Sequence, residues 1–531
     1  MSGKLSDSIE HKQNVNNDRE KFFKTGSNTP EEPDKFTVFE RWLMLNGTNL
    51  PKLELKDYGD EMRGCHTKED IHDEEVIIEV PLKCLITVEM GKETEIGQAI
   101  LKSRIELDAP KHIFLMIFML VDRLNPDSFF KPYYDILPAT LNNMPIFWTP
   151  QELKYLTGSY MLEQIDERNV AIEADYLAIC GIAPEFRNVA TLQEFKWARM
   201  CVCSRNFGLV INNIQTAAMV PYADMLNHYR PRETKWQFDD DRQGFTVVSL
   251  QGIPAGAQVY DSYGRKCNHR FLLNYGFSVE NNLEADGFCP NEVPLLLEIR
   301  KNDPLFDVKC TFYRRDLSVP QRRVRVCVSD NENTKLLLAL LRVIDADRYF
   351  TSKYALLMLC SGLCNDNIAA LLLGYRDDFD LLVTGAGNSL HRSLREAQLP
   401  ISVHNELRAM QSLLHLIAHY LAQYPTSYEQ DVARLANNDL APFSNERHAV
   451  IQIKGEKEVL LFFRDFAQTA ISLLQCADII QFDELLEQIR DTKHPVIYYH
   501  SKGPLLRLHQ EELRRTEMRR RKVDLSRPTV V

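Results

Sequence analysis

Two short polar motifs in the middle of the chain constrain its fold more than any other feature. The first is V-P-Y-A-D-M-L-N-H at residues 220–228, and the second is G-A-Q-V-Y-D-S-Y-G at residues 256–264. Branched residues at 246–250 predict a β-strand, residues 254–256 have turn chemistry, and residues 258–263 alternate as a half-buried strand does. The Asp, Asn, His and Tyr side chains therefore lie at the rims of short strands. Because buried polar groups need partners, this arrangement indicates a ligand site rather than simple core.

The length and charge of the chain narrow the class of protein. A chain of 531 residues is too long for one hydrophobic core and suggests two or three domains. Its net charge of -11 argues against general nucleic-acid binding. The longest apolar run, at residues 113–121, is far shorter than the roughly twenty residues that span a bilayer. We expect a buried helix there, no membrane segment, and a cytoplasmic and/or nuclear protein, since the polar start has no signal-peptide pattern.

The sequence gives little indication of a metal. Its twelve cysteines are scattered and include no C-x-x-C pair, so neither a zinc ribbon nor a thioredoxin-like centre is supported. Asp224 and His228 have helical spacing, but no third ligand with suitable spacing accompanies them. We expect all twelve cysteines to be reduced thiols, and we expect no metal ion.

Composition and periodicity divide the chain into consecutive parts. Residues 1–34 are polar and predict a disordered tail, whereas residues 35–282 hold both motifs and a mainly helical stretch at 95–190. Long amphipathic helices dominate residues 283–500, after an alternating, strand-like pattern at 309–328. Residues 501–531 form a basic tail, which we expect to include a solvated helix. A localisation or phosphate-binding patch is the alternative for that tail.

Some local elements follow from single residues. An amphipathic helix is expected at residues 35–46, closed by Gly47. Thr149 is a natural N-cap ahead of Pro150 at the first position of another helix. A turn at residues 61–65 followed by a strand at 74–81 is the expected opening of the β-rich part.

Taken in order, the central motifs resemble the C-terminal half of a SET domain. The ordered set is D-x-x-N-H, then A-G-x-x-V-Y-x-x-Y-G, then N-Y-G-F at residues 274–277. The chain is similar to the subfamily of the plant Rubisco large-subunit lysine methyltransferase, whose relatives include the actin-histidine methyltransferase. Motifs between residues 404 and 460, such as Y-P-T and E-K-x-x-L, resemble the helical substrate-binding domain of that subfamily. The resemblance covers roughly residues 35–475.

The resemblance implies an α+β fold, with a SET-domain β-fold of short strands, a helical insertion and a mainly α-helical C-terminal domain. It also implies S-adenosylmethionine as the methyl donor, without a metal. Asn227 and His228 would hold the adenine end of the donor, with Asp224 bracing their loop. Arg205, in the S-R-x-F segment, would bind the donor's carboxylate, because a guanidinium makes a planar two-pronged contact with a carboxylate.

The opening motif matches the family less closely. Glu61 and Arg63 lie where the family's glycine-rich turn runs along the methyl donor, and we assign both to the donor site by this resemblance. Met62 replaces the first glycine and Cys65 replaces a Leu or Ile. A plain hairpin is the alternative for this segment.

The resemblance also assigns the residues around the target nitrogen. Tyr263 matches the family's catalytic tyrosine, whose hydroxyl orients the nitrogen and the methyl group, and Tyr275 and Phe207 would wall the target channel. A lysine has a pKa near 10.4 and must lose a proton, which an apolar, aromatic channel favours. The actin-histidine branch has an Asn where this chain has Phe207, and it lacks a tyrosine matching Tyr275. Both differences favour lysine as the target.

We therefore expect an S-adenosylmethionine-dependent protein-lysine N-methyltransferase whose partner is a protein presenting a lysine, expected to be a non-histone protein. Histone lysine methylation stays open. One alternative is protein-histidine methylation of the actin-modifying type. Another is a SET-like scaffold without catalysis, for which Met62 is the best support. Taken singly, each site residue also fits an ordinary turn, core or cross-strand packing position.

Overall fold

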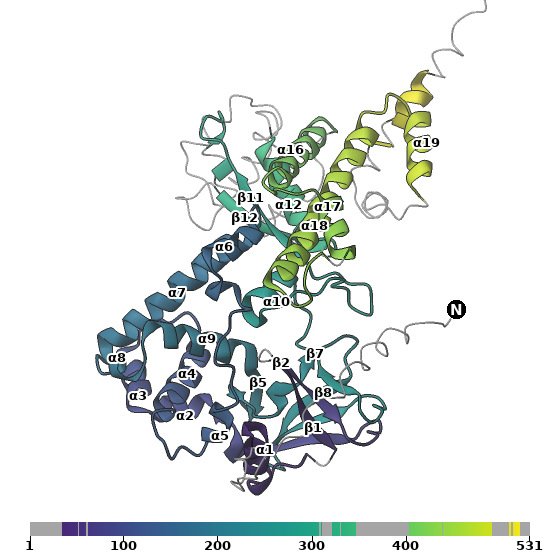
Figure 1. Cartoon of the computed structure of the whole chain (residues 1–531). Helices are drawn as coiled ribbons and strands as arrows, with labels where there is room; N and C mark the ends of the chain where they lie inside the picture. The colour runs from purple at the N-terminus through teal and green to yellow at the C-terminus, as the bar shows by residue number, and fades with distance from the viewer. Residues whose placement is uncertain are drawn as a thin grey trace, which may run out of the picture.

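The computed structural model describes most of the chain in an α+β arrangement. It describes residues 34–50, 52–59, 62–306, 309–310, 321–329, 331–346, 403–437, 439–490, 509–510 and 513–520. The predicted disordered tail, apart from its last residue, lies outside the described residues. Figure 1 shows the strands β1, β2, β7 and β8 gathered at one end of the molecule and the helices α12, α16 and α18 at the other.

Three small sheets make up the β-rich end. The first has the order β1-β2-β10-β7, the second β3-β9-β8 and the third β4-β6-β5. Their bounds are β1 (Leu53–Gly59), β2 (Met62–Thr67), β3 (Val76–Pro81), β4 (Ile86–Thr87), β5 (Asn206–Ile211), β6 (Ile214–Met219), β7 (Asn227–His228), β8 (Thr234–Asp239), β9 (Gly244–Ser249) and β10 (Gln258–Asp261). Strand β10 pairs with β2 in the antiparallel sense and with β7 in the parallel sense. This topology brings the two central motifs of the sequence side by side.

Two local predictions need correction. Residues 62–67 form the strand β2 instead of a turn, because β1 and β10 both supply hydrogen-bonding partners for them. A side chain at Gly64 would displace its neighbours, since an added Cβ would lie 2.2 Å from the Tyr58 hydroxyl. The predicted strand at 258–263 ends at Asp261, so Tyr263 lies in the loop that follows it.

Helices cover the sheets and fill the insertion between β4 and β5. They are α1 (Lys35–Leu45), α2 (Val88–Glu93), α3 (Glu95–Ser103), α4 (Pro110–Asp122), α5 (Lys131–Tyr134), α6 (Pro150–Leu153), α7 (Met161–Ile182), α8 (Phe186–Val189), α9 (Leu192–Arg205) and, after β10, α10 (Asn268–Tyr275). The expected opening helix and the buried core helix are present as α1 and α4. The expected cap is also confirmed, because the Thr149 hydroxyl accepts a hydrogen bond from the Glu152 backbone at 3.3 Å.

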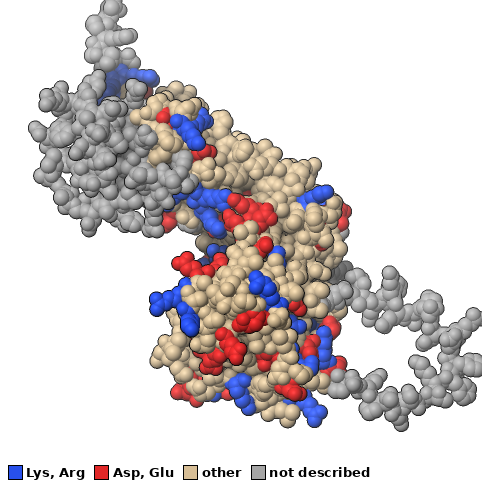
Figure 2. Space-filling model, turned by 90° about the vertical axis from the view of Figure 1, so that its left-hand side faces the viewer, with Lys and Arg blue, Asp and Glu red and all other residues tan. Residues whose placement is uncertain are grey.

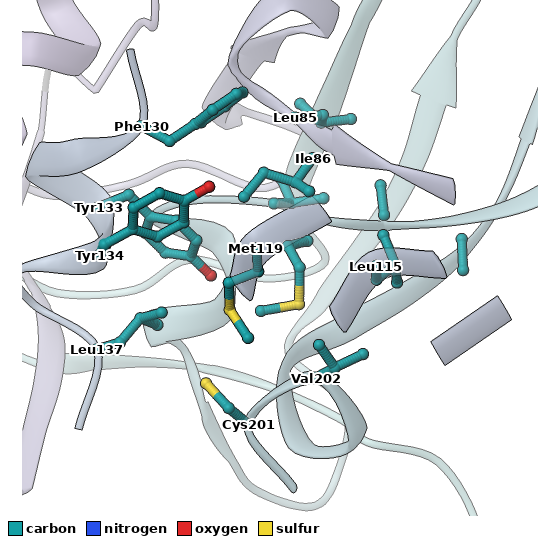
Figure 3. Packing of buried hydrophobic residues seen from close by; sticks show 14 of the residues in the cluster. Leu85, Ile86, Leu115, Met119, Phe130, Tyr133, Tyr134, Leu137, Cys201 and Val202 are labelled. Atoms are coloured by element: carbon teal, nitrogen blue, oxygen red, sulfur yellow. The ribbon is translucent and has the colours of Figure 1, made fainter. Parts of the chain in front are cut away.

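The core of this end is a continuous aromatic and aliphatic cluster. Figure 3 shows the rings of Tyr133 and Tyr134 close together, near the side chains of Met119 and Leu137. Tyr133 is fully buried, and its ring centroid lies 6.1 Å from that of Phe39 on α1. The opening helix is thus part of this core.

The other end of the molecule has its own core. Its elements are β11 (Glu292–Glu298), β12 (Gln321–Cys327), α12 (Asn331–Ile344), α16 (Val403–Leu421), α17 (Tyr428–Ala436), α18 (Asn445–Leu474) and α19 (Ile479–Arg490). Strands β11 and β12 form an antiparallel pair, and the buried faces of α12, α16 and α18 pack with them in one cluster. The predicted alternation at 309–328 corresponds in part to β12, while residues 311–320 lie outside the described residues.

Helix α18 joins the two ends. Near its start, Asn445 donates from its side-chain amide to the Asn142 carbonyl at 3.0 Å, and His448 Nδ1 accepts from the Ser278 backbone at 3.1 Å. About two turns further along, the buried Glu456 carboxylate accepts hydrogen bonds from the hydroxyls of Ser159 and Tyr424. Beyond this point the helix enters the second core.

The charged surface and the state of the cysteines can be compared with the expectations from composition. On the face in Figure 2, acidic and basic side chains are interspersed. The ten cysteines within the described ranges are free thiols, while Cys360 and Cys364 lie outside those ranges. None of the helices that the structure describes has the length and hydrophobicity of a membrane-spanning segment. In the basic tail, residues 513–520 are helical and mostly exposed.

A buried ion pair between α12 and α16 gives a test of the second core. Arg342 donates to the Glu406 carboxylate at 2.7 and 3.0 Å, and both side chains are 2% exposed. We expect Glu406→Ala to lower the free energy of unfolding by about 3–5 kcal/mol, because it leaves a buried guanidinium without its carboxylate. Urea unfolding followed by circular dichroism measures this change.

The matched control is Glu332→Ala on α12, whose carboxylate pairs with Lys335 at 2.6 Å and is 77% exposed. We expect a change below about 1 kcal/mol there. Equal effects of the two substitutions would contradict the assignment of the Arg342 pair to the core.

Candidate functional site

The loop at residues 220–228 makes a tight turn before β7. It contains the short 3-10 helix η4 (Ala223–Met225). Tyr222 has a φ of 77°, in the left-handed region that residues with a side chain rarely adopt. Its buried ring stacks on Phe39 with 6.3 Å between centroids. The packing of Tyr222 in the core therefore holds the strained backbone of the loop that carries Asp224.

A buried cluster of charges surrounds Asp224. Arg205, at the end of α9, donates from Nη1 to the Asp224 carboxylate at 3.1 Å and to its backbone carbonyl at 3.2 Å. The Tyr133 hydroxyl donates to the same carboxylate at 2.8 Å. Burial raises the pKa of Asp224, and the nearby Arg205, Tyr133 and Arg63 counteract that rise. Burial and the neighbouring Arg205 lower the pKa of Arg63 to about 10.

This cluster retains unused hydrogen-bonding capacity. The Nε of Arg205 and the Oδ1 of Asp224 are buried and have no hydrogen-bond partner. Buried polar atoms without partners are rare in folded proteins and call for an explanation. Two cations, Arg63 and Arg205, face one carboxylate here, so the cluster suits a further anionic group such as a ligand's carboxylate.

Asn227 connects the two motifs with the opening strand. Its side-chain amide donates to the Arg63 carbonyl on β2 at 2.8 Å and to the Gln258 side chain on β10 at 3.1 Å. In the parallel register, Tyr260 lies opposite Asn227 and Asp261 lies opposite His228. Three segments that are distant in sequence therefore meet at one asparagine.

His228 and Tyr263 are held together by backbone and ring contacts. The Tyr263 backbone N–H donates to His228 Nδ1 at 3.0 Å, and the two rings stack with 5.2 Å between centroids. Burial, together with Arg230 and Lys266, lowers the pKa of His228 to about 4. The imidazole is therefore neutral at physiological pH, as its acceptor role at Nδ1 requires.

Tyr263 and Tyr275 form an aromatic pair next to this contact. Their rings stack with 4.8 Å between centroids and 26° between planes. The Tyr263 hydroxyl donates to the Leu226 carbonyl at 2.9 Å. Burial raises the pKa of Tyr263 well above its usual value and that of Tyr275 to about 12, so both phenols keep their protons at neutral pH. Tyr263 is thus a fixed hydroxyl rather than a base.

Most of the predicted site residues come together in the structure. Arg63, Arg205, Asp224, Asn227, His228, Tyr263 and Tyr275 are linked by the contacts above. Phe207 is the second residue of strand β5, and the ring contacts described for it are with Trp236 and Phe245, at 5.2 and 5.0 Å. Its role as a channel wall stays a prediction. Glu61 lies outside the described residues.

The structure adds residues that sequence reasoning missed. Tyr133 reaches Asp224 from an aromatic segment that the sequence indicated only as part of the insertion. Phe271 and Phe277 complete the aromatic surround of His228, with centroids 4.9 and 6.0 Å from its ring. The N-Y-G-F motif contained a signal for Phe277, whereas nothing local to Tyr133 indicated a partner 91 residues away.

Comparisons with known proteins match two consecutive regions of this chain to described families. Residues 62–264 match the family described as SET domain, and residues 300–460 match the family described as Rubisco LSMT substrate-binding. The chain therefore contains a region that matches a SET domain, followed by a region that matches a Rubisco LSMT substrate-binding domain. This confirms the predicted resemblance and the α+β fold.

The similar proteins include both histidine methyltransferases and an enzyme solved with bound lysine. The actin-histidine N-methyltransferase of Dasypus novemcinctus is 28% identical over 442 residues, which cover 80% of this chain and 68% of that protein. That of Homo sapiens is 27% identical over 439 residues, covering 80% and 67%. A crystal structure of the SET domain of LSMT bound to lysine and AdoHcy aligns with a TM-score of 0.63 at 22% identity, covering 88% of this chain and 98% of that chain. The structure of Rubisco LSMT bound to AdoMet has a TM-score of 0.62 at 22% identity, covering 87% and 97%.

The low pKa of His228 predicts a pH-dependent stability. Its folded-state pKa of about 4 lies below the value of about 6.5 for an exposed imidazole, so the unfolded chain binds more protons between these values. Stability from this residue is complete above pH 6.5 and is lost as the pH falls toward 4. We expect His228→Asn to reduce the loss of unfolding free energy between pH 7 and pH 5 by about 1–2 kcal/mol.

Urea unfolding at the two pH values measures this difference. His404→Asn on α16, which removes an exposed imidazole, is the control and should leave the pH dependence unchanged. An identical pH dependence for wild type and His228→Asn would contradict the neutral, buried state of this histidine.

Proposed function

We propose that this chain is an S-adenosylmethionine-dependent protein-lysine N-methyltransferase that acts on a non-histone protein. The observation that carries the proposal is the meeting of two features at one place. A buried charged cluster with unpartnered polar atoms includes Asp224, just before β7, and the Tyr263–Tyr275 aromatic pair begins just after β10, which pairs with β7. Arg205 and Asp224 both influence the pKa of Tyr263, so the two features are neighbours. Methyl transfer needs a donor site and an amine site in line with each other.

The donor site fits this chain's residues. Arg205 and Arg63 would take the donor's carboxylate, with Asp224 and Tyr133 fixing the guanidinium of Arg205. The loop around Asn227 and His228 would border the adenine end. The donor supplies its methyl group as an electrophilic carbon on a sulfonium centre. The two solved relatives described with AdoMet and AdoHcy support this choice of donor.

The amine site would act by orientation and desolvation. The Tyr263 oxygen is fixed by its bond to the Leu226 carbonyl and retains lone pairs that can orient an N–H group. The aromatic surface of Tyr263, Tyr275 and Phe277 is poor in hydration and so favours the neutral form of an entering amine. A fixed tyrosine hydroxyl and a surface that excludes water lower the activation free energy for orienting and desolvating the reacting nitrogen.

Lysine is favoured over histidine by the stacked tyrosines. An alkyl amine has few polar atoms to satisfy, and an apolar aromatic wall suits its four-carbon stem. An imidazole presents a second ring nitrogen that needs its own hydrogen-bond partner. Histidine methylation is the second candidate, because curated relatives at 26–28% identity are named as actin-histidine N-methyltransferases.

The second end of the molecule would bind the protein substrate beside the site. This part of the proposal rests on the match of residues 300–460 to the Rubisco LSMT substrate-binding family. Helix α18 contacts both ends, so a substrate bound to the helical part would have a fixed position relative to Tyr263.

Labelling identifies the modified residue directly. A cell extract is incubated with the purified chain and a donor carrying an isotopically labelled methyl group, and the labelled peptides are sequenced by mass spectrometry. We expect methyl-lysine on a non-histone protein. Label on histidine alone would overturn the lysine assignment, and no label above a Tyr263→Phe control would overturn the enzyme assignment.

Donor binding depends on Arg205 in this proposal. We expect Arg205→Met to weaken S-adenosylmethionine binding by roughly 10- to 100-fold, since it removes a charge-assisted contact worth about 1.5–3 kcal/mol. Isothermal titration calorimetry measures this affinity. The control is Arg242→Met, which removes an exposed arginine paired with Glu79 and Asp239. Unchanged donor affinity in Arg205→Met would contradict the assigned donor site.

Turnover depends on the Tyr263 hydroxyl. We expect Tyr263→Phe to lower kcat by roughly 100-fold or more with little change in donor affinity, because the hydroxyl orients the nitrogen only as the reaction proceeds. Single-turnover kinetics and calorimetry on the same preparation measure both quantities. Tyr428→Phe, which removes a hydroxyl bonded to Glu458 on α18, is the control. An equal loss of turnover and donor affinity would make Tyr263 a structural residue.

A further inference from the structure

A second cluster of side chains that can bind metals lies just after the loop that holds Tyr263. Cys267 immediately precedes α10, His269 is the second residue of that helix, and Glu292 is the first residue of β11. The Cys267 sulfur lies 3.0 Å from His269 Nδ1, and Nδ1 lies 3.9 Å from a Glu292 oxygen. All three ligand atoms lie within 4.8 Å of one another. Methyl transfer as derived above uses none of these groups.

We propose that Cys267, His269 and Glu292 bind one Zn²⁺ ion. Zinc takes thiolate, imidazole and carboxylate ligands at about 2.0–2.3 Å in a tetrahedron, which puts the ligand atoms roughly 3.3–3.8 Å apart. The distances of 3.0 and 3.9 Å that involve His269 Nδ1 need shifts of a few tenths of an ångström to match, and the Cys267 sulfur and the Glu292 oxygen lie within 4.8 Å of each other. The mixture of one soft sulfur with nitrogen and oxygen suits zinc better than magnesium or calcium, which prefer oxygen alone.

The surrounding structure fixes these ligands in place. Asn291, next to Glu292, accepts a hydrogen bond from the Asn268 backbone at 3.1 Å and another from the Asn282 side chain at 2.8 Å. These bonds join the start of α10 to the start of β11. Cys267 and His269 are 5% and 4% exposed. A preformed set of buried ligands reduces the ordering that an ion would have to impose.

Outer contacts also have the pattern of a metal site. The Tyr160 ring lies edge-on to His269, and its hydroxyl donates to the Glu292 carbonyl at 3.1 Å. Arg325 donates to the Glu292 carboxylate at 2.8 Å. Carboxylate ligands are usually hydrogen-bonded by such outer partners, which orient them toward the ion.

The fourth position has access to solvent. A cavity of about 480 Å³ lies against Cys267 and Glu292 and opens at the surface. Water can therefore complete the tetrahedron. Arg265 and Arg270 line the same cavity, and they disfavour a bare cation. One thiolate and one carboxylate neutralise Zn²⁺, so the occupied site presents no net charge to these arginines.

Binding is balanced by the loss of one proton. The Cys267 thiol gives up its proton as the sulfur–zinc bond forms, and the proton leaves through the open cavity to solvent. No oxidant or reductant is needed. The ion would tie the segment that follows Tyr263 to the first strand of the helical end, which makes its role structural.

Zinc content and cobalt spectroscopy test the site on the full chain. Protein expressed with added zinc and passed through a desalting column should contain close to one zinc per chain by plasma mass spectrometry. Cys267→Ser and His269→Gln should lose most of it, while Cys476→Ser, which removes a thiol at the far end of α18, should retain it. Wild-type protein without stoichiometric zinc, or Cys267→Ser with an undiminished content, would overturn the proposal.

Cobalt substitution keeps the test valid if a variant fails to fold. Wild-type protein freed of metal by a chelator and given Co²⁺ should show a thiolate-to-cobalt charge-transfer band and the intense visible bands of a tetrahedral site. Zn²⁺ added in excess should abolish these bands and raise the unfolding temperature. A weak, six-coordinate spectrum like that of aqueous Co²⁺ would show that Cys267 and His269 are only hydrogen-bonded core residues.

Discussion

The structure depends on the parallel pairing of two very short strands, β7 and β10. Only two residue pairs are in register, Tyr260 with Asn227 and Asp261 with His228. Parallel pairing over so short a length is weak by itself. It is reinforced by the Asn227 amide, which bonds to both β2 and β10, and by the His228 ring, which accepts the Tyr263 backbone N–H. Hydrogen bonds from side chains thus stabilise a strand pair that is too short to be held by backbone hydrogen bonds alone.

Two different electrostatic environments border this contact. Before β7, Asp224 forms a buried polar cluster with Arg205 and Tyr133, in which Arg205 Nε and Asp224 Oδ1 have no hydrogen-bond partner. After β10, the rings of Tyr263, Tyr275 and Phe277 form an aromatic cluster. The proposed reaction needs both surroundings, one for a charged donor and one for a neutral nucleophile, and the pairing of β7 with β10 brings together the segments that supply them.

Sequence reasoning predicted the fold class, and it named residues most of which the structure brings together, because both depend on local motifs in a fixed order. Asn227, His228 and Tyr263 lie in such motifs, and capping chemistry located α6 from Thr149 and Pro150. What escaped prediction depends on distant contacts. Tyr133 meets Asp224 only because the insertion folds back over the sheet, and residues 62–67 are a strand only because β1 and β10 flank them. No spacing in the sequence expresses either contact.

Helix α18 has a consequence for how such a protein can change in evolution. Its 30 residues extend for about 45 Å, with the first turns packed on the β-rich end and the later turns inside the other core. Glu456, whose pKa burial raises to about 7, lies midway along it and is bonded from both sides. The helix therefore connects the two halves, and its removal would expose buried surface on both of them. An unrelated domain that replaced one half would need its own complementary surface for this helix. We therefore expect the two halves to be inherited as a single unit.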